Sequence, residues 1–169
     1  MVEGGWLIAF IAVERIAEVI VAQRNTRRLL AEGAVEFGRG HYFLIVGFHV
    51  AWLGALWLLG REHEVDRLLL AVFFALQAAR VWTIASLGRR WTTRVIVVPG
   101  ARLVSRGPYR FLRHPNYAIV ALEIALVPLA LGLPAMAVVA SLVNAALLFW
   151  RIRVENAALG HYLSGSTPR

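Results

Sequence analysis

A dense polar cluster lies at residues 105–117, where a loop runs into an apolar segment. It contains His114 directly before Pro115, and Asn116 and Tyr117 directly after it. Proline suits the first turn of a helix, so these side chains would surround a helix N-terminus, whose free N–H groups suit an anionic or polar ligand. The alternative interpretation is an interfacial belt, in which Arg and Tyr side chains anchor a helix end at the membrane boundary.

A second polar cluster, Arg151 and Glu155, follows the last apolar run. The two residues are four positions apart and share one helix face, so they could form a surface ion pair worth a few tenths of a kcal/mol. The two apolar runs before this cluster are joined only by residues 132–134, which favours a tight antiparallel pair of helices. Such a pair would bring the second cluster close to the first, so that the two face each other across one pocket.

The elements that carry these clusters are predicted to cross a membrane. Hydrophobic residues make up 59% of the 169 residues, and mean hydropathy is +0.64, whereas soluble domains contain roughly 45–50% apolar residues. Five apolar runs are each near the ~20 residues that span a bilayer; they cover about residues 6–22, 43–59, 68–87, 117–131 and 134–150. The sequence therefore predicts an all-α integral membrane protein with five transmembrane helices in a single domain.

The distribution of basic residues predicts the orientation of these helices. All 18 basic residues are arginine, and the net charge is +8. Fourteen arginines lie on one predicted side, in the loop after the first run, in the segment after the third run and in the tail. Short loops rich in arginine stay in the cytoplasm, so we expect the N-terminus outside a bacterial cell membrane and the C-terminus inside. This orientation explains the basic charge without a nucleic-acid partner.

The stretch of about 25 residues between the third and fourth runs is a loop rather than a span. Residues 94–98 are β-prone, and Pro99-Gly100 and Gly107-Pro108 are turn signals. Loops of this length in compact proteins are usually functional. We expect residues 94–116 to fold over the cytoplasmic mouth of the bundle together with the tail, so that the catalytic region covers about residues 94–163.

Charged side chains within the predicted spans have two possible roles. Glu14, Glu18, Arg80 and Glu123 would each be costly in a bilayer unless paired or solvated. In the structural interpretation, Arg80 pairs with one of the acids and locks the bundle. In the functional interpretation, Glu123, two turns below Tyr117, lines a tunnel for a lipophilic substrate.

Several kinds of site are not expected. The chain has no cysteine, which excludes disulfides, thiolate metal sites and a cysteine nucleophile. The five histidines are scattered along the sequence, so no metal site is expected. The segment Gly38-Arg39-Gly40 is only a lone G-x-G, and it does not predict the glycine-rich turn of a soluble nucleotide-binding domain.

Taken together, the two clusters resemble the isoprenylcysteine carboxyl methyltransferase family of integral membrane enzymes. The resemblance covers about residues 68–163 and rests on R-H-P-x-Y at 113–117 and R-x-x-x-E at 151–155. It implies that the protein binds S-adenosylmethionine and that Arg151 orients the acceptor. The cofactor contacts that it implies are Leu103, Val104, Tyr109, His114, Pro115, Asn116, Tyr117 and Glu155.

The resemblance also implies a lipophilic acceptor, either isoprenyl or alkyl-chain, that is methylated on a carboxylate or hydroxyl oxygen. The N-terminal half, including Glu36, Tyr42 and His49, resembles a bacterial branch thought to O-methylate alkylpyrones or phenolic lipids. A carboxylate or an acidic hydroxypyrone needs little or no general base, whereas a phenol, with a pKa near 10, needs one. His114 is the nearest candidate base, and Arg151 and His114 are therefore the predicted catalytic residues.

Two departures from the family pattern concern the substrate more than the cofactor. Ala101-Arg102 stand where the family often has a His-Thr or His-Leu pair, and Asn156 replaces a second acid. Two other functions are compatible with the composition, namely a small transporter and a non-enzymatic membrane scaffold. A transporter would favour inverted repeats or broken helices at mid-membrane, whereas the polar residues here crowd one interface. A scaffold leaves the paired clusters unexplained. The expected partners are a lipophilic or prenylated substrate and membrane lipids.

Overall fold

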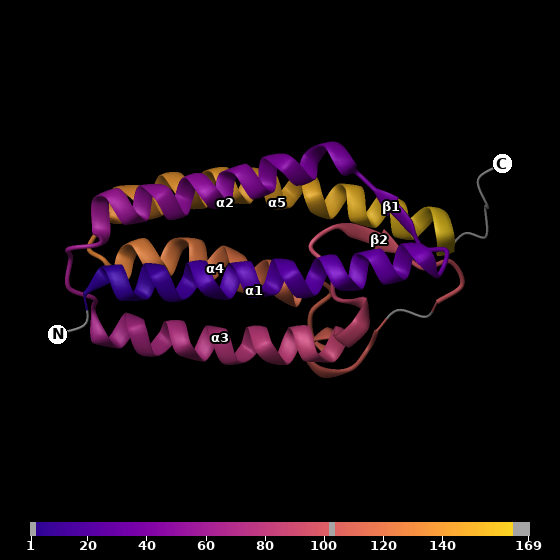
Figure 1. The fold of residues 1–169 in the computed structure, drawn as a ribbon, viewed down its shortest axis with the longest axis horizontal. Coiled ribbons are helices and arrows are strands. Elements are labelled where there is room, and N and C mark those ends of the chain that lie inside the picture. Colours follow the sequence, from indigo (N-terminus) through magenta and orange to yellow (C-terminus); the bar gives the residue numbers. More distant parts are fainter. Residues whose placement is uncertain (1–2, 102–103, 164–169) are drawn as a thin grey trace.

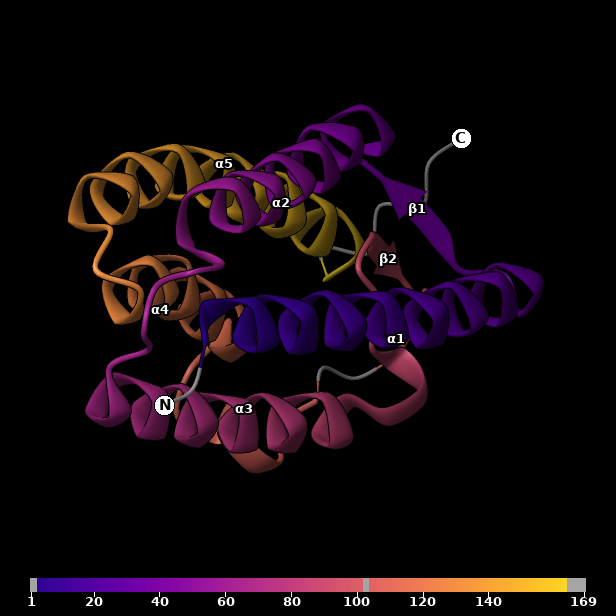
Figure 2. The same ribbon diagram turned by 60° about the vertical axis from the view of Figure 1, so that its left-hand side comes forward.

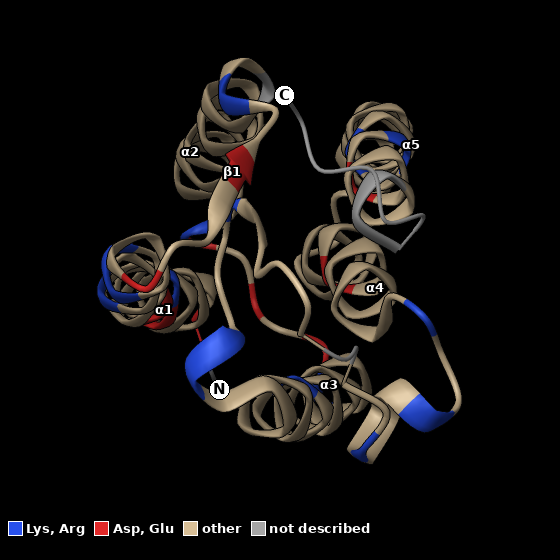
Figure 3. Cartoon of the chain, turned by 90° about the vertical axis from the view of Figure 1, so that its right-hand side faces the viewer, with Lys and Arg blue, Asp and Glu red and all other residues tan. Residues whose placement is uncertain are grey.

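The computed structural model describes residues 3–101 and 104–163, and within them five long helices run side by side along one axis (Figure 1). The helices are α1 (Gly4–Ala31), α2 (Arg39–Gly60), α3 (Arg67–Leu87), α4 (Pro115–Ala130) and α5 (Pro134–Leu163). Viewed end-on, they surround a central region in the order α1, α2, α5, α4 and α3 (Figure 3). The fold is therefore a helical bundle, as predicted.

Three of these helices are long and apolar enough to cross a membrane, over Tyr42–Gly60, Arg67–Arg90 and Pro134–Gly160. Helix α4 is apolar but has only 16 residues, and α1 carries three charged residues between positions 14 and 18. Length and composition alone thus identify three candidate spans rather than five.

The outer surface of the bundle is apolar along most of its length. Trp6, Leu58, Leu68 and Leu142 lie on four different helices, and each is between 68% and 76% exposed. So many exposed apolar side chains would favour aggregation in water. Lipid tails are as apolar as these side chains and can surround them without that penalty. The surface is what a membrane-embedded bundle requires.

One half of the bundle holds the apolar core. Leu7 and Ile11 of α1 pack with Leu56 of α2, Phe73 of α3 and Ile124 of α4, and all five are buried. These residues lie toward the end of the bundle that contains the start of α1. The other half, which contains the end of α1, is packed differently and holds the candidate site.

Two short strands mark that second half, which we call the strand end. β1 (Val35–Phe37) pairs antiparallel with β2 (Val95–Val97), with Glu36 opposite Ile96. Figure 2 shows β1 leading from α1 toward α2 and meeting β2 at this end of the bundle. The β-prone character of residues 95–97 is confirmed, but the sequence did not predict its partner, because a three-residue strand is too short to show an alternating pattern.

The pairing of α4 with α5 is confirmed. Gly132 has a φ of +69°, in the left-handed region that glycine adopts without strain. The Leu133 N–H donates to the Pro128 carbonyl at 2.8 Å, and Pro134 begins α5. This tight turn returns α5 along α4, so the part of α5 near Arg151 lies beside the start of α4, and the remainder of α5 extends beyond it.

Two predicted helix ends are wrong. Helix α1 continues to Ala31 rather than ending near residue 22, so Arg24, Arg27 and Arg28 project from a helix and not from a loop. Helix α5 continues to Leu163 rather than ending near residue 150. Hydropathy marks where the apolar part of a helix ends, but packing extends both helices further. Leu29 of α1 is buried, and Ala158 of α5 packs on the strand pair.

The charges inside the bundle form one network that joins α1, α3 and α4. Arg80 donates to both carboxylate oxygens of Glu18, with an Nη2–Oε2 distance of 2.7 Å, and through Nη1 to Glu123 Oε2 at 2.9 Å. Arg15 donates to Glu18 at 3.0 Å and to Glu123 at 3.3 Å. Gln77 Nε2 donates to Glu123 Oε1 at 2.7 Å. The predicted pairing of Arg80 with an acid is confirmed, and Arg80 binds two acids rather than one.

We predict that Arg80→Met destabilises the protein by about 3–5 kcal/mol, because it leaves Glu18 and Glu123 buried with one shared arginine. The Arg80 side chain is only 5% exposed. The measurement is the free energy of unfolding in mixed micelles, with helix content as the signal. Arg67→Met, on the same helix at an exposed position, is the matched control and should have little effect. Equal stability of the two variants would contradict a structural role for the network.

Candidate functional site

A cavity of about 1100 Å³ lies in the strand half of the bundle. Its walls come from all five helices and from the segment between α3 and α4 that contains β2. Small-molecule pockets usually have volumes of about 300–1,000 Å³. The cavity is therefore large enough for a cofactor and part of a second ligand.

Most of the residues predicted from the two polar clusters line this one cavity. They are Val104, Tyr109, His114, Asn116, Tyr117, Arg151 and Glu155. Pro115 is buried in the first turn of α4 behind them, and Leu103 lies outside the described residues. The tertiary structure thus brings together segments that are up to 50 positions apart in the sequence.

Arg151, Tyr117 and Glu155 form a chain of hydrogen bonds between α4 and α5. Arg151 Nε donates to the Tyr117 hydroxyl oxygen at 2.8 Å, and the Tyr117 hydroxyl donates to Glu155 Oε2. The Arg151 residue is only 8% exposed. Arg151 and Glu155 therefore do not form the surface ion pair that their spacing allowed, because a hydroxyl group lies between their opposite charges.

His114 and Asn116 present unsatisfied polar atoms beside this chain. The His114 ring stacks on the Tyr117 ring, with centroids 5.2 Å apart and planes 14° apart. His114 Nδ1 lies 3.8 Å from Glu155 Oε2, beyond hydrogen-bond distance. Among the described residues, His114 Nε2 and Asn116 Oδ1 are buried without a hydrogen-bond partner. Buried polar atoms without partners are costly, so both atoms are candidate contacts for a polar ligand of the adjacent cavity.

Tyr109 enters the cavity from a short 3₁₀ helix, η2 (Gly107–Arg110), that packs on the end of α3. Burial, and then the nearby Glu155 carboxylate, raise the pKa of Tyr109 to about 12, so its hydroxyl stays protonated at neutral pH. Gly107 has a φ of +59°, and a Cβ there would lie 2.1 Å from Ser86 Oγ. Only glycine permits this close approach, which positions Tyr109.

Four residues that hold Arg151 in place were not predicted as site residues. Arg151 Nη2 donates to the Thr93 carbonyl at 2.8 Å, and the Thr93 hydroxyl lies 3.3 Å from the Tyr42 hydroxyl. The Arg94 guanidinium lies over the Tyr42 ring at 4.8 Å and donates to Glu36 Oε1 at 2.9 Å. The Glu36 side chain is only 3% exposed. These contacts join positions about 50 or more apart, and no local spacing in the sequence reveals them.

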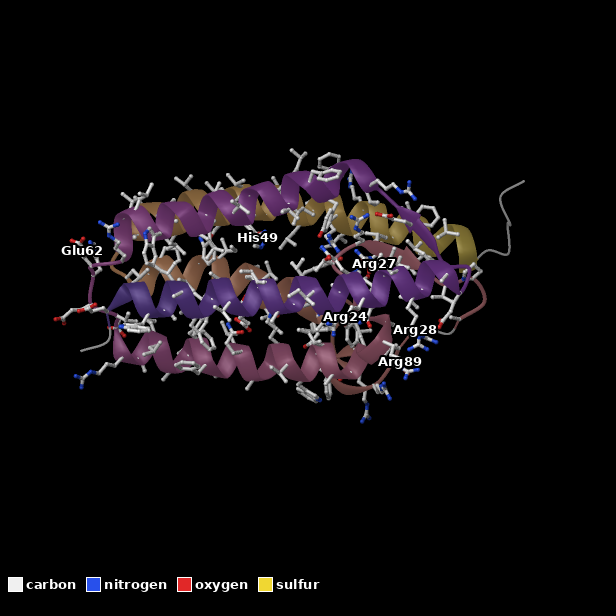
Figure 4. All side chains as sticks on the ribbon, in the orientation of Figure 1. Arg24, Arg27, Arg28, His49, Glu62 and Arg89 are labelled. Carbon is white, nitrogen blue, oxygen red and sulfur yellow. The ribbon has the colours of Figure 1, made fainter. Side chains whose placement is uncertain are left out.

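Glu123 and His49 lie deeper in the bundle. Glu123 belongs to the ion network and is not among the residues that line the large cavity; contact between Glu123 and a substrate stays a prediction. His49 lines the cavity from α2 (Figure 4) and donates from Nδ1 to the Ile45 carbonyl at 2.8 Å. This bond gives one nitrogen of the His49 ring a partner within α2.

Comparison with known proteins identifies the family of this chain. The family model of the isoprenylcysteine carboxyl methyltransferase (ICMT) family matches residues 68–161. The chain is 40% identical over 161 residues to the uncharacterized protein YpbQ of Bacillus subtilis (strain 168), and the alignment covers 92% of this chain and 96% of that protein. It is 24% identical over 164 residues to an uncharacterized protein of Haemophilus influenzae (strain ATCC 51907 / DSM 11121 / KW20 / Rd), covering 90% and 92% of the two chains. No solved structure gives a significant match.

The family match includes α3, α4 and most of α5, and with them the R-H-P-x-Y and R-x-x-x-E residues that line the cavity. The apolar helices agree with a membrane location. The chain therefore belongs to the isoprenylcysteine carboxyl methyltransferase family of membrane methyltransferases.

Proposed function

We propose that this protein is an S-adenosylmethionine-dependent O-methyltransferase that acts on a lipophilic acceptor. The observation that carries the proposal is the meeting of two features in one cavity. One is the Arg151–Tyr117–Glu155 hydrogen-bond chain, and the other is the pair of buried, unpartnered atoms on His114 and Asn116. Arg151 and Glu155 keep further nitrogen and oxygen atoms outside the chain, and the two buried atoms have no partner in the protein, so both features offer bonds to a polar ligand.

The side chains around His114 fit the proposed cofactor. S-adenosylmethionine supplies an electrophilic methyl group on a sulfonium, which an oxygen nucleophile takes by in-line displacement. Glu155 is an acceptor for ribose hydroxyls or an ammonium group, and the Tyr109 and Tyr117 rings attract a cation. His114 Nε2 and Asn116 Oδ1 offer the remaining polar contacts, and Val104, with Leu103 and Pro115, completes the proposed cofactor set.

Arg151 is suited to hold the acceptor oxygen. Tyr117 and Thr93 accept from two of its nitrogens, so the guanidinium is held in a single orientation. It is permanently charged and attracts a carboxylate, an enolate or a phenolate oxygen. Holding donor and acceptor in line can by itself supply about 7–11 kcal/mol of the barrier reduction. For a phenol acceptor, His114 is the proposed base.

The rest of the cavity suits an apolar chain. Aliphatic side chains from α1, α2 and α5 form much of its lining, including Ile16, Ile20, Val46, Val50 and Leu147, and Arg15, Glu18 and Arg80 of the ion network also line it. We propose that this part holds an isoprenyl or alkyl chain whose head carries the acceptor oxygen. An isoprenylcysteine carboxylate, an alkylpyrone and a phenolic lipid all have this form, and the proposed acceptor is one of these three classes.

We also propose that all five helices cross the membrane, with the strand end in the cytoplasm. The charges of α1 at positions 14–18 contact Arg80 and Glu123 inside the bundle, so they do not prevent α1 from spanning the bilayer. Arginines gather at the strand end, as the positive-inside rule requires of a cytoplasmic face. The N-terminus then lies outside.

The cofactor assignment predicts that Glu155→Gln weakens binding of S-adenosylhomocysteine about 10- to 150-fold. Glutamine keeps the size and the acceptor for Tyr117 but removes a charge whose buried hydrogen bond is worth about 1.5–3 kcal/mol. The measurement is titration calorimetry in detergent micelles. Glu62→Gln, at an exposed position at the opposite end of the bundle, is the matched control and should bind like the unmodified protein. An unchanged dissociation constant in Glu155→Gln would refute the assignment.

The acceptor assignment predicts a different result for Arg151. Arg151→Ala should bind S-adenosylhomocysteine nearly normally but lower methyl transfer by about 10- to 150-fold, since a hydrogen bond to a charged group is lost. Arg151→Lys should restore little activity, because lysine lacks the planar fork. Transfer of a labelled methyl group is measured to a prenylated cysteine, an alkylpyrone and an alkylphenol.

The control for Arg151 is Arg153→Ala, two residues further along α5. This substitution removes an exposed arginine whose guanidinium lies over the Phe149 ring. It should leave methyl transfer unchanged. If Arg151→Ala loses cofactor affinity as strongly as Glu155→Gln does, the two residues act as one unit and the proposed division between acceptor and cofactor is incorrect.

A further inference from the structure

An exposed group of arginines lies at the strand end, outside the cavity. Arg24, Arg27 and Arg28 project from the last turns of α1, and Arg89 projects from η1 (Gly88–Arg90), the 3₁₀ helix that follows α3. All four are exposed, and Figure 4 shows them along the end of α1 and on the neighbouring segment. We call them the α1–η1 basic patch.

The two elements that carry this patch are fixed to each other. Asn25 Nδ2 donates to the Trp91 carbonyl at 2.8 Å and to the Gly88 carbonyl at 3.3 Å. Both carbonyls flank Arg89 in the sequence. These bonds hold the end of α1 against η1. The backbones that carry the exposed arginines therefore keep a fixed arrangement at one end of the bundle.

The patch keeps most of its positive charge. Arg28 Nε lies 2.8 Å from Glu32 Oε1, in an exposed pair one turn apart. Exposed pairs of this kind are weak, so Glu32 offsets at most one of the four charges. At the opposite end of the bundle, Arg61 is paired with Glu62, and Arg67 follows Asp66 directly, so no comparable excess of charge exists among the described residues there.

The position of the patch along the bundle corresponds to the lipid headgroups. Ile20 and Val21 are the last large apolar side chains exposed on α1 before its arginines begin. Arg24 follows about 4.5 Å further along the helix axis, and Arg28 about 6 Å beyond it, at 1.5 Å per residue. The headgroup layer beside a ~30 Å hydrocarbon core begins at this distance. The guanidinium groups therefore reach the depth of lipid phosphates.

We propose that the α1–η1 basic patch binds the phosphate of an anionic phospholipid, of the phosphatidylglycerol class, in the leaflet at the strand end. Guanidinium forks match phosphate oxygens in two-point contacts, and two elements at a fixed separation allow more than one arginine to contact the same headgroup. Depth in the bilayer favours a lipid over a soluble polyanion. The proposal rests on the membrane placement of α1 given under Proposed function, but not on the proposed methyltransferase activity.

The test is lipid binding by the full chain in neutral detergent. Short-chain phosphatidylglycerol and short-chain phosphatidylcholine are titrated in parallel, and bound lipid is counted by native mass spectrometry. We compare the double variant Arg24→Gln/Arg89→Gln with the control Arg61→Gln/Arg67→Gln, which removes the same formal charge from the opposite end. A basic residue near an anionic surface contributes about 1 kcal/mol, so the patch variant should bind phosphatidylglycerol about 30-fold more weakly than the control. Binding should also weaken as salt increases.

Each outcome bears on the proposal. Equal binding of phosphatidylglycerol by the two double variants overturns it, and so does equal binding of the two lipids by the unmodified chain. Displacement of the lipid by inorganic phosphate or by a short oligonucleotide at the same concentration would identify a soluble-anion site and overturns the lipid assignment. Helix content in neutral detergent shows whether the variants fold. If the double patch variant does not, Arg24→Gln and Arg89→Gln alone should each lower affinity about 5-fold, and no change in either overturns the proposal.

Discussion

The buried ion network is the interaction on which the rest of this structure depends. Arg80 of α3 binds Glu18 of α1 and Glu123 of α4, and Arg15 binds the same two acids. Arg80 and Glu123 are almost fully buried, and a buried charge that loses its partner is far more costly than one at a protein surface. The network therefore holds α1 in one position against α3 and α4, even though α1 is too polar to be fixed there by lipid alone.

Placing α1 in this way also shapes the cavity. The first half of α1 packs into the apolar core with Leu56 and Phe73. The second half of α1 extends to the strand end and leads into β1. Because β1 pairs with β2, the segment before β2 is held over the cavity, where the Thr93 carbonyl accepts from Arg151. The N-terminal part of the chain lies outside the family match at 68–161, yet Tyr42 and Glu36 from this part help to position a residue of the R-x-x-x-E element.

A neutral hydroxyl between opposite charges gives the site two different ends. Tyr117 accepts from Arg151 and donates to Glu155, so neither charge is neutralised by direct contact with the other. Arg151 and Glu155 both line the cavity, and Glu155 lies beside His114 and Tyr109. A direct ion pair would have neutralised both charges. With the tyrosine between them, the cavity keeps a cationic group and an anionic group at separate positions.

The sequence by itself determined the features that depend on local pattern. Long apolar runs predicted the helical bundle, the short connection at residues 132–134 predicted the α4–α5 pair, and that pair implied that Arg151 and Glu155 would meet His114 and Tyr117. Only the tertiary structure decided which acids bind Arg80, how far α1 extends, and that Glu36, Tyr42 and Thr93 hold Arg151. The reason is physical, because periodicity and turn residues report interactions between near neighbours in the chain. A pair of three-residue strands leaves no such pattern in the sequence. Nor does a hydrogen bond between a carbonyl and a side chain 58 positions away. Both contacts form only when the packed helices bring the two groups together.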